Sequence, residues 1–128
     1  MKILVVDDEA DIRLLFEQRF RREIRDEQLS FSFALSGEEA LAYLEQDRHY
    51  SEVVLILSDI NMPGMSGLEL LRRIKSTHPT QPPLVMMITA YDEADSYATA
   101  LQLGAHDFLS KPLDFAVLKE KLLQLNHT

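Results

Sequence analysis

The sequence predicts an α/β fold in which a parallel sheet is covered by helices on both faces. Segments typical of a strand and of a helix alternate five times along the 128 residues. Several strand segments are continuous apolar runs, such as Val53–Leu57, and runs of this kind indicate strands buried on both faces. The chain shows no repeat or linker, so we expect one domain over residues 1–128, complete or as the N-terminal part of a longer protein.

The strand and helix signals follow one another in a regular order. The expected strands are residues 2–7, 31–35, 53–58, 84–88 and 106–109. The expected helices begin near Ala10, Ser36, Ser66, Ala94 and Asp114. Two of these starts are capping boxes, because a glutamate, Glu39 or Glu69, stands three residues after the serine.

Apolar residues in the helical segments recur at the spacing of one helix face. The first helix is expected to bury Ile12, Leu15, Phe16 and Phe20. The fourth is expected to bury Ala94, Tyr97, Ala98 and Leu101. Charged residues dominate the stretch 21–28, which should therefore project into solvent, and residues 46–51 form a polar segment before the third strand.

Composition argues against several classes of protein. The formal net charge of −8 disfavours a nucleic-acid surface, which needs a basic stripe. The chain has no cysteine, which removes disulfides, thiol catalysis and thiolate metal sites and fits a reducing compartment. No segment approaches the length of a membrane span. We therefore expect a cytoplasmic domain with no membrane partner and no direct nucleic-acid partner.

Chemically active side chains follow four of the expected strands: Asp7 and Asp8, Asp59, Thr89 and Lys111. In a parallel α/β sheet these strand ends share one edge, where ligands bind. Crowded carboxylates repel one another unless a cation lies between them, and all-oxygen ligands suit Mg²⁺. A lysine and a hydroxyl supply the donors that an anion on Asp59 requires. Because carboxylates can act as nucleophiles in phosphoryl transfer, the pattern indicates phosphoryl acceptance on Asp59.

Four sequence motifs surround these side chains: Val-Val-Asp-Asp-Glu at 5–9, Ser-Asp-Ile-Asn-Met-Pro-Gly-Met-Ser-Gly at 58–67, Ile-Thr-Ala at 88–90 and Gly-Ala-His-Asp-Phe-Leu-Ser-Lys-Pro at 104–112. With these motifs the chain resembles the receiver (CheY-like) domains of two-component response regulators over essentially its whole length. The resemblance implies a flavodoxin-like, doubly wound (βα)5 fold with a five-stranded parallel sheet of order 2-1-3-4-5.

The resemblance also implies roles for the residues at the strand ends. Asp59 is expected to accept a phosphoryl group from a sensor histidine kinase or a phosphotransfer protein. Asp7, Asp8 and Asp59, together with the backbone carbonyl of Asn61, are expected to hold Mg²⁺, or Mn²⁺ in its place. Lys111 is expected to pair with the phosphoryl oxygens. The domain is then a regulatory phospho-acceptor that phosphorylates and dephosphorylates only itself, not an enzyme acting on other substrates.

The resemblance further implies a switch and an output surface. Thr89 is expected to move towards the phosphoryl group while Phe108, at a position often held by tyrosine, rotates inward without a hydroxyl to bond. Asn61 and Tyr91 fall where the family tunes phosphate lifetime, and Lys111–Pro112 is expected to be a cis peptide. The fourth helix, fifth strand and fifth helix are expected to form a surface that controls a partner protein, a homodimer or a fused effector.

Three other kinds of protein share parts of this pattern. A degenerate receiver would be a docking module that works without phosphorylation, although every expected site residue is present. A phosphatase of the haloacid dehalogenase kind carries its two aspartates two positions apart on the first strand, whereas Asp7 and Asp8 are adjacent. A flavodoxin-like cofactor binder needs a loop that cradles phosphate, and the acidic residues 8–11 would repel one.

Overall fold

The computed structural model describes residues 1–46, 49–77, 82–89 and 94–126. Five parallel strands form one sheet of order β2-β1-β3-β4-β5, which confirms the expected topology. The strands are β1 (Lys2–Val6), β2 (Ser30–Ala34), β3 (Val53–Asp59), β4 (Leu84–Thr89) and β5 (Asp107–Ser110). Their bounds lie within one or two residues of the expected ones.

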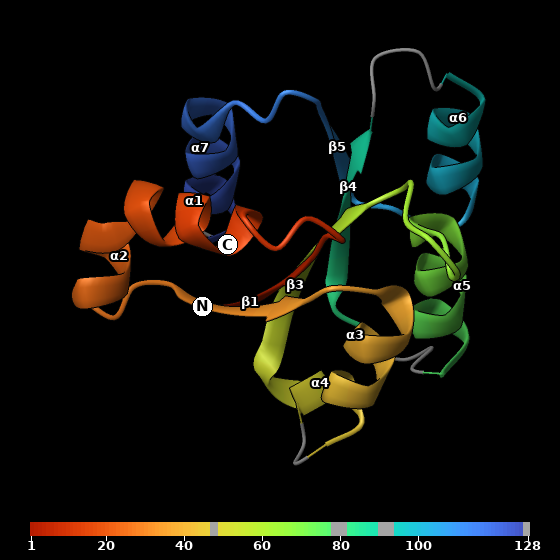
Figure 1. Ribbon diagram of the computed structural model, residues 1–128, viewed down its shortest axis with the longest axis horizontal. Helices are drawn as coiled ribbons and strands as arrows, with labels where there is room; N and C mark the ends of the chain where they lie inside the picture. The colour runs from red at the N-terminus through yellow and green to blue at the C-terminus, as the bar shows by residue number, and fades with distance from the viewer. Residues whose placement is uncertain (47–48, 78–81, 90–93, 127–128) are drawn as a thin grey trace.

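Helices cover both faces of the sheet. They are α1 (Ile12–Arg19), α2 (Arg21–Arg25), α3 (Gly37–Leu44), α4 (His49–Glu52), α5 (Gly67–Thr77), α6 (Ala94–Gln102) and α7 (Phe115–Asn126). Figure 1 shows α1, α2 and α7 on one side of the sheet and α3, α5 and α6 on the other. Among the described residues, no helix is long and apolar enough to cross a membrane.

The sheet divides the hydrophobic core into two clusters. Because successive strand residues point to opposite faces, Ile3 and Val5 of β1 join the cluster beneath α1 and α7, while Leu4 and Val6 join the cluster beneath α3 and α5. All four are at most 1% exposed. Burying a side chain of this size stabilises the fold by about 1.5–3 kcal/mol, so both layers contribute. This explains why the central strands read as unbroken apolar runs.

The serine half of each expected capping box forms. The Ser36 hydroxyl accepts a hydrogen bond from the Glu39 backbone N–H at 3.0 Å, and Ser66 accepts one from Glu69 at 3.2 Å. Each bond satisfies an amide that the first turn of a helix leaves without a backbone partner. The serines therefore set where α3 and α5 begin, directly after β2 and after the loop that follows β3.

The expectation that residues 21–28 project into solvent holds for six of the eight residues and is wrong for Glu23 and Ile24. Residues 21–25 form α2, whose Ile24 packs against the cluster beneath α1 and α7. Glu23 is only 7% exposed and pairs with Lys119 of α7. The partner that permits this burial lies 96 positions away, so the local charge pattern did not reveal it. Leu15, expected in the core, is 42% exposed.

The expected buried face of the fourth helix is also wrong for the residues that can be placed. Ala98 is exposed and Leu101 is 50% exposed, while Ala100 is fully buried and Leu103 is partly buried. The segment offers two apolar stripes, and packing of α6 against α5 selects the one containing Ala100. The side chains of Ala94 and Tyr97 lie outside the described part of the chain. The polar segment 46–51 contains the start of α4.

Candidate functional site

Three carboxylates meet at the carboxyl edge of the sheet. Strands β1 and β3 are neighbours with Val6 paired to Ser58, so the residues that follow these two positions, Asp7 and Asp59, come side by side. One carboxylate oxygen each of Asp7, Asp8 and Asp59 lies within 4.8 Å of the others. Asp7 and Asp59 are each 3% exposed, whereas Asp8 is open to solvent.

A close backbone approach fixes the end of β3. The Gly67 N–H donates to the Ile60 carbonyl at 2.8 Å, so the first turn of α5 lies against the residues that carry the carboxylate. A Cβ atom on Gly67 would stand 2.2 Å from the Asp59 carbonyl oxygen. Only glycine fits there without moving backbone. The loop 61–66 can therefore leave the strand and return as a helix beside the site.

Each buried carboxylate receives a backbone hydrogen bond. The Glu9 N–H donates to Asp7 Oδ1 at 2.9 Å, and the Asn61 N–H donates to Asp59 Oδ1 at 3.2 Å. The second oxygen of Asp59, Oδ2, accepts from Lys111 Nζ at 2.6 Å. Backbone donors orient both groups, since bonds to a charged acceptor are stronger than bonds between neutral groups.

Lys111 reaches the carboxylates from the end of β5. Its backbone N–H donates to the Thr89 carbonyl at 2.8 Å, which anchors it to the end of β4. The Lys111–Pro112 peptide is cis, as the resemblance implied. The Lys111 side chain is about one third exposed, so its charge lies at the boundary between solvent and the buried Asp59.

The crowded charges shift the pKa values of Asp7 and Lys111. Burial, and then the neighbouring charge of Asp59, raise the pKa of Asp7, although the Glu9 N–H and Lys111 oppose them. Burial lowers the pKa of Lys111, but its hydrogen bond to Asp59 and the charges of Asp59 and Asp7 outweigh burial and raise it overall. The cluster therefore carries more negative charge than one lysine balances.

The donor set fits a hard divalent cation. It offers carboxylate oxygens only, and Asp8 leaves one side of the cluster open to water. Mg²⁺ prefers oxygen ligands at about 2.1 Å and keeps several of its waters. Oxygens already within 4.8 Å of one another need only small side-chain rotations to share such an ion. A divalent ion would also relieve the repulsion that raises the Asp7 pKa.

The other expected site residues lie around this cluster at different depths. Thr89 ends β4 and is buried, one position beyond Ile88, the residue paired with Asp59. Phe108 lies on β5 opposite Met87 and is partly buried against the cluster beneath α3 and α5. The Asn61 side chain is exposed. Tyr91, and Ala90 within the Ile-Thr-Ala motif, lie outside the described residues.

An apolar pocket beside the carboxylates was missed from the sequence. Its polar end is formed by Asp7, Glu9 and Lys111. Its apolar walls come from α1, β4 and the residues that lead into α7: Ile12, Leu15, Ile88, Pro112, Leu113 and Phe115. We call this pocket the site groove. The apolar residues directly after Lys111 were the sequence feature that could have indicated this pocket. They predict a pocket only when it is known that α1 packs beside them.

A parallel α/β sheet with these acids, this hydroxyl and this lysine at its carboxyl edge defines a class of phosphoryl-accepting signalling domain. Comparison with known proteins agrees. The model of the response regulator receiver domain matches residues 3–123. The response regulator protein PilR of Pseudomonas aeruginosa is 40% identical over 93% of this chain and 24% of its own length. A chemotaxis protein CheY homolog of Campylobacter jejuni is 33% identical over 95% of this chain and 89% of its own.

Solved structures show the same fold. The signal receiver domain of a DNA-binding response regulator from Colwellia psychrerythraea superposes with a TM-score of 0.82 at 26% identity, covering 100% of this chain and 99% of that one. The chain belongs to the response regulator receiver domain family, whose function is to accept a phosphoryl group. It spans about a quarter of the length of PilR and of the NtrC proteins it also matches.

Proposed function

We propose that Asp59 is the phospho-acceptor of this receiver domain and that a phosphohistidine of a sensor kinase or phosphotransfer protein is the donor. One observation carries the proposal: the Asp59 carboxylate is buried, shares space with Asp7 and Asp8, and binds the Lys111 ammonium at 2.6 Å. A carboxylate used only for structure gains nothing from two further acids beside it. A phospho-acceptor gains a cation site on one side, from the neighbouring acids, and a fixed hydrogen-bond donor, Lys111, on the other.

Phosphoryl transfer needs positioning and neutralisation of charge more than covalent assistance. An Asp59 oxygen forms the new O–P bond while the N–P bond to the donor imidazole breaks and its electron pair returns to the ring. The Asn61 N–H keeps the Asp59 carboxylate oriented. Lys111, already bound to Asp59, is placed to follow the negative charge onto the phosphoryl oxygens.

Asp7, Asp8 and Asp59 are the residues that would hold Mg²⁺ or Mn²⁺, with the Asn61 carbonyl as a further oxygen ligand. The cation would supply charge neutralisation between the carboxylates and the incoming phosphoryl group. The chemistry of the donor set supports this assignment, since every side-chain ligand is an oxygen and the cluster is short of positive charge.

The site groove is proposed as the surface that receives the phosphodonor protein. It joins an apolar wall to the polar end made by Asp7, Glu9 and Lys111. Leu15, at its α1 side, is exposed, so a partner can bury it while bringing a histidine to Asp59. This gives a physical reason why Leu15 fits the apolar spacing of α1 and yet lies outside the core.

Output is proposed to pass through Thr89 and Phe108 to the surface of α6, β5 and α7. Thr89 and Ser110 are paired across β4 and β5, and Phe108 is two residues before Ser110. A shift of Thr89 towards a phosphoryl group therefore acts on the strand that carries Phe108. Exposed apolar side chains on α6 and α7, Leu101, Val117 and Leu123, are available to a partner, a second copy or a fused effector.

The test is phosphorylation of the purified chain by a small phosphodonor such as acetyl phosphate with Mg²⁺. We expect the protein to gain the mass of one phosphoryl group in a base-labile linkage, and peptide mapping to place it on Asp59. Asp59→Asn should gain none. Asp114→Asn makes the same substitution at the exposed start of α7, is the matched control and should behave as the wild type. If the wild type gains no phosphate, the proposal is wrong and a phosphorylation-independent docking module is the better description. If Asp59→Asn gains as much as the wild type, the proposal is wrong because another residue is the acceptor.

A further inference from the structure

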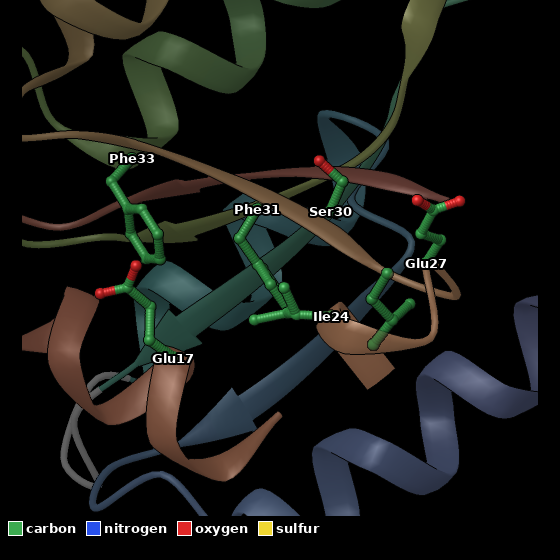
Figure 2. A pocket seen from close by; sticks show the side chains of 7 residues that line it. Glu17, Ile24, Glu27, Ser30, Phe31 and Phe33 are labelled. Carbon is green, nitrogen blue, oxygen red and sulfur yellow. The ribbon is translucent and has the colours of Figure 1, made fainter. Parts of the chain in front are cut away.

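A second pocket, which shares no residue with the site groove, lies at the β2 edge of the sheet. Figure 2 shows it between α1, α2 and β2. The apolar side chains that line it are Ile24, Leu29, Phe31 and Phe33, and the charged ones are Glu17 and Glu27. We call it the edge pocket. It exists because residues 21–25 fold into α2 and place Ile24 opposite β2.

The chemistry of the edge pocket is apolar in the middle and acidic at its ends. Figure 2 places the Glu17 carboxylate beside Phe33 and the Glu27 carboxylate beyond Ile24 on the other side. Glu17 has a distant neighbour in Arg13, at 3.8 Å between Oε2 and Nε, but both side chains are about half exposed or more. An exposed pair of this length holds its partners only weakly. Arg13 also lies over the Phe33 ring, 5.4 Å from its centroid, so a partner's basic side chain has to displace Arg13 at Glu17, whereas Glu27 is exposed and directly available to a bound cation.

The strand beside the pocket is an unprotected edge. In the described residues β2 pairs with β1 alone, and it stands at the end of the sheet order. Its sequence and the next residue, Ser-Phe-Ser-Phe-Ala-Leu at 30–35, contain no charge, no proline and no glycine. Edge strands usually carry such residues because they block pairing with another chain. This edge keeps its capacity to pair.

We propose that the edge pocket binds an extended segment of a partner protein that lies along β2, with one apolar side chain over Phe31 and Ile24 and a basic side chain two positions away on each side. Alternate side chains of a strand face the same way, so residues at i, i+2 and i+4 reach one pocket. The charge of the pocket favours a basic partner segment over a second copy of this chain. A basic segment complements Glu17, Glu27 and the net charge of −8, whereas a second copy of this chain would bring the same acids and the same charge.

The probe is a labelled peptide with the sequence Ser-Lys-Thr-Leu-Thr-Lys-Ser, titrated into the purified chain and followed by fluorescence anisotropy. The double variant Glu17→Gln/Glu27→Gln should weaken binding about tenfold, because two charge pairs with the peptide are lost. The matched control is Glu45→Gln/Glu120→Gln, which makes the same change in net charge at two exposed positions, one directly after α3 and one on α7, and should stay within about twofold.

Peptide variants test the strand geometry. Moving both lysines next to each other, with composition unchanged, should weaken binding as much as the protein variant does. Methylating the backbone nitrogens on one edge of the peptide should abolish it, since those amides donate to the β2 edge. Amide hydrogen exchange should slow at residues 30–35 when the unmodified peptide binds.

Several results would overturn the proposal. The proposal is wrong if no binding is seen at about 1 mM peptide, which corresponds to no useful affinity. It is also wrong if the control variant weakens peptide binding as much as Glu17→Gln/Glu27→Gln does, or if the rearranged peptide binds as tightly as the original. Slower amide exchange at residues 7, 8 and 59 in place of 30–35 would likewise contradict it. Dimerisation of the unliganded chain through residues 30–35 would assign the edge to a second copy. Acetyl phosphate labelling of Glu17→Gln/Glu27→Gln at the wild-type rate shows separately that the phosphorylation site is intact.

Discussion

Two buried carboxylates of this protein each bind one lysine, yet their surroundings differ. Asp59 binds Lys111 at 2.6 Å, and Glu23 binds Lys119 at 2.5 Å. Asp59 lies among two further acids. Glu23 belongs to no such group in the described part of the chain, and Lys119 lowers its pKa, while burial and Asp59 raise the pKa of Asp7.

The difference teaches how one type of ion pair serves two purposes. At Glu23 one buried negative charge pairs with Lys119 between α2 and α7, and Arg22 adds a second positive charge nearby, so the acid is fully compensated and the pair fixes the position of α2. At Asp59 one lysine faces three acids, so the folded protein retains repulsion that a bound cation and a phosphoryl group can exploit. An excess of negative charge marks the reactive pair, whereas the acid of the structural pair is fully compensated by nearby cations.

The largest expected effect is a difference in phosphorylation rate between variants of Lys111 and Lys119. Lys111→Ala should slow phosphorylation by acetyl phosphate about 100-fold, because a positioned donor to the developing charge is lost. Lys119→Ala should leave the rate within about twofold, since Lys119 contacts Glu23 and not the carboxylate cluster. The rate of phosphoprotein formation, measured by intact mass at fixed Mg²⁺, checks both. Equal rates for the two variants would contradict the assigned difference.

The second effect separates the same pairs by stability. Lys119→Met leaves the buried Glu23 without its hydrogen-bonded cation and should lower the free energy of unfolding by about 2 kcal/mol. Asp59→Asn removes one of three crowded charges and should leave the metal-free protein at least as stable as the wild type. Urea unfolding without Mg²⁺ measures both. A loss in Asp59→Asn as large as that in Lys119→Met would mean that Asp59–Lys111 is a structural pair after all.

Mg²⁺ should act on one region only. At ten times its dissociation constant, the ion should raise the free energy of unfolding of the wild type by about 1.4 kcal/mol. Asp8→Asn should lose most of this gain, whereas Glu23→Gln should keep all of it. Thermal unfolding with and without Mg²⁺ compares the three proteins. A gain retained in Asp8→Asn would place the cation elsewhere.

The two regions also differ in how much the sequence revealed of them. Asp7 and Lys111 directly follow a strand and Asp59 ends one, and a parallel sheet brings all such positions to one edge, so order along the chain was sufficient. Glu23 depends on α2, a single turn among charged residues whose stability comes from Ile24 and from Lys119 on a distant helix. The buried face of α6 also depends on a distant partner. Its sequence contains two apolar stripes, and packing against α5 buries the one that contains Ala100. Local patterns predict strand ends well, but they contain no information about such distant partners.

The smallest effect is the pH dependence of the Glu23 pair. Its pKa is lowered from 4.5 in the folded protein, chiefly by Lys119, so its contribution to stability is present above pH 4.5 and is lost as the pH falls through the lowered value. Glu23→Gln should therefore be less stable than the wild type at pH 6 by about 1 kcal/mol, and this deficit should shrink as the pH falls below 4.5. Urea unfolding of the wild type and of Glu23→Gln, measured from pH 6 to below pH 4.5, gives this difference in stability. Because the carboxylate cluster is present in both, its own titration cancels in the difference. A deficit that grows on acidification would mean that the folded protein raises the pKa of Glu23, and that burial outweighs Lys119 at this pair.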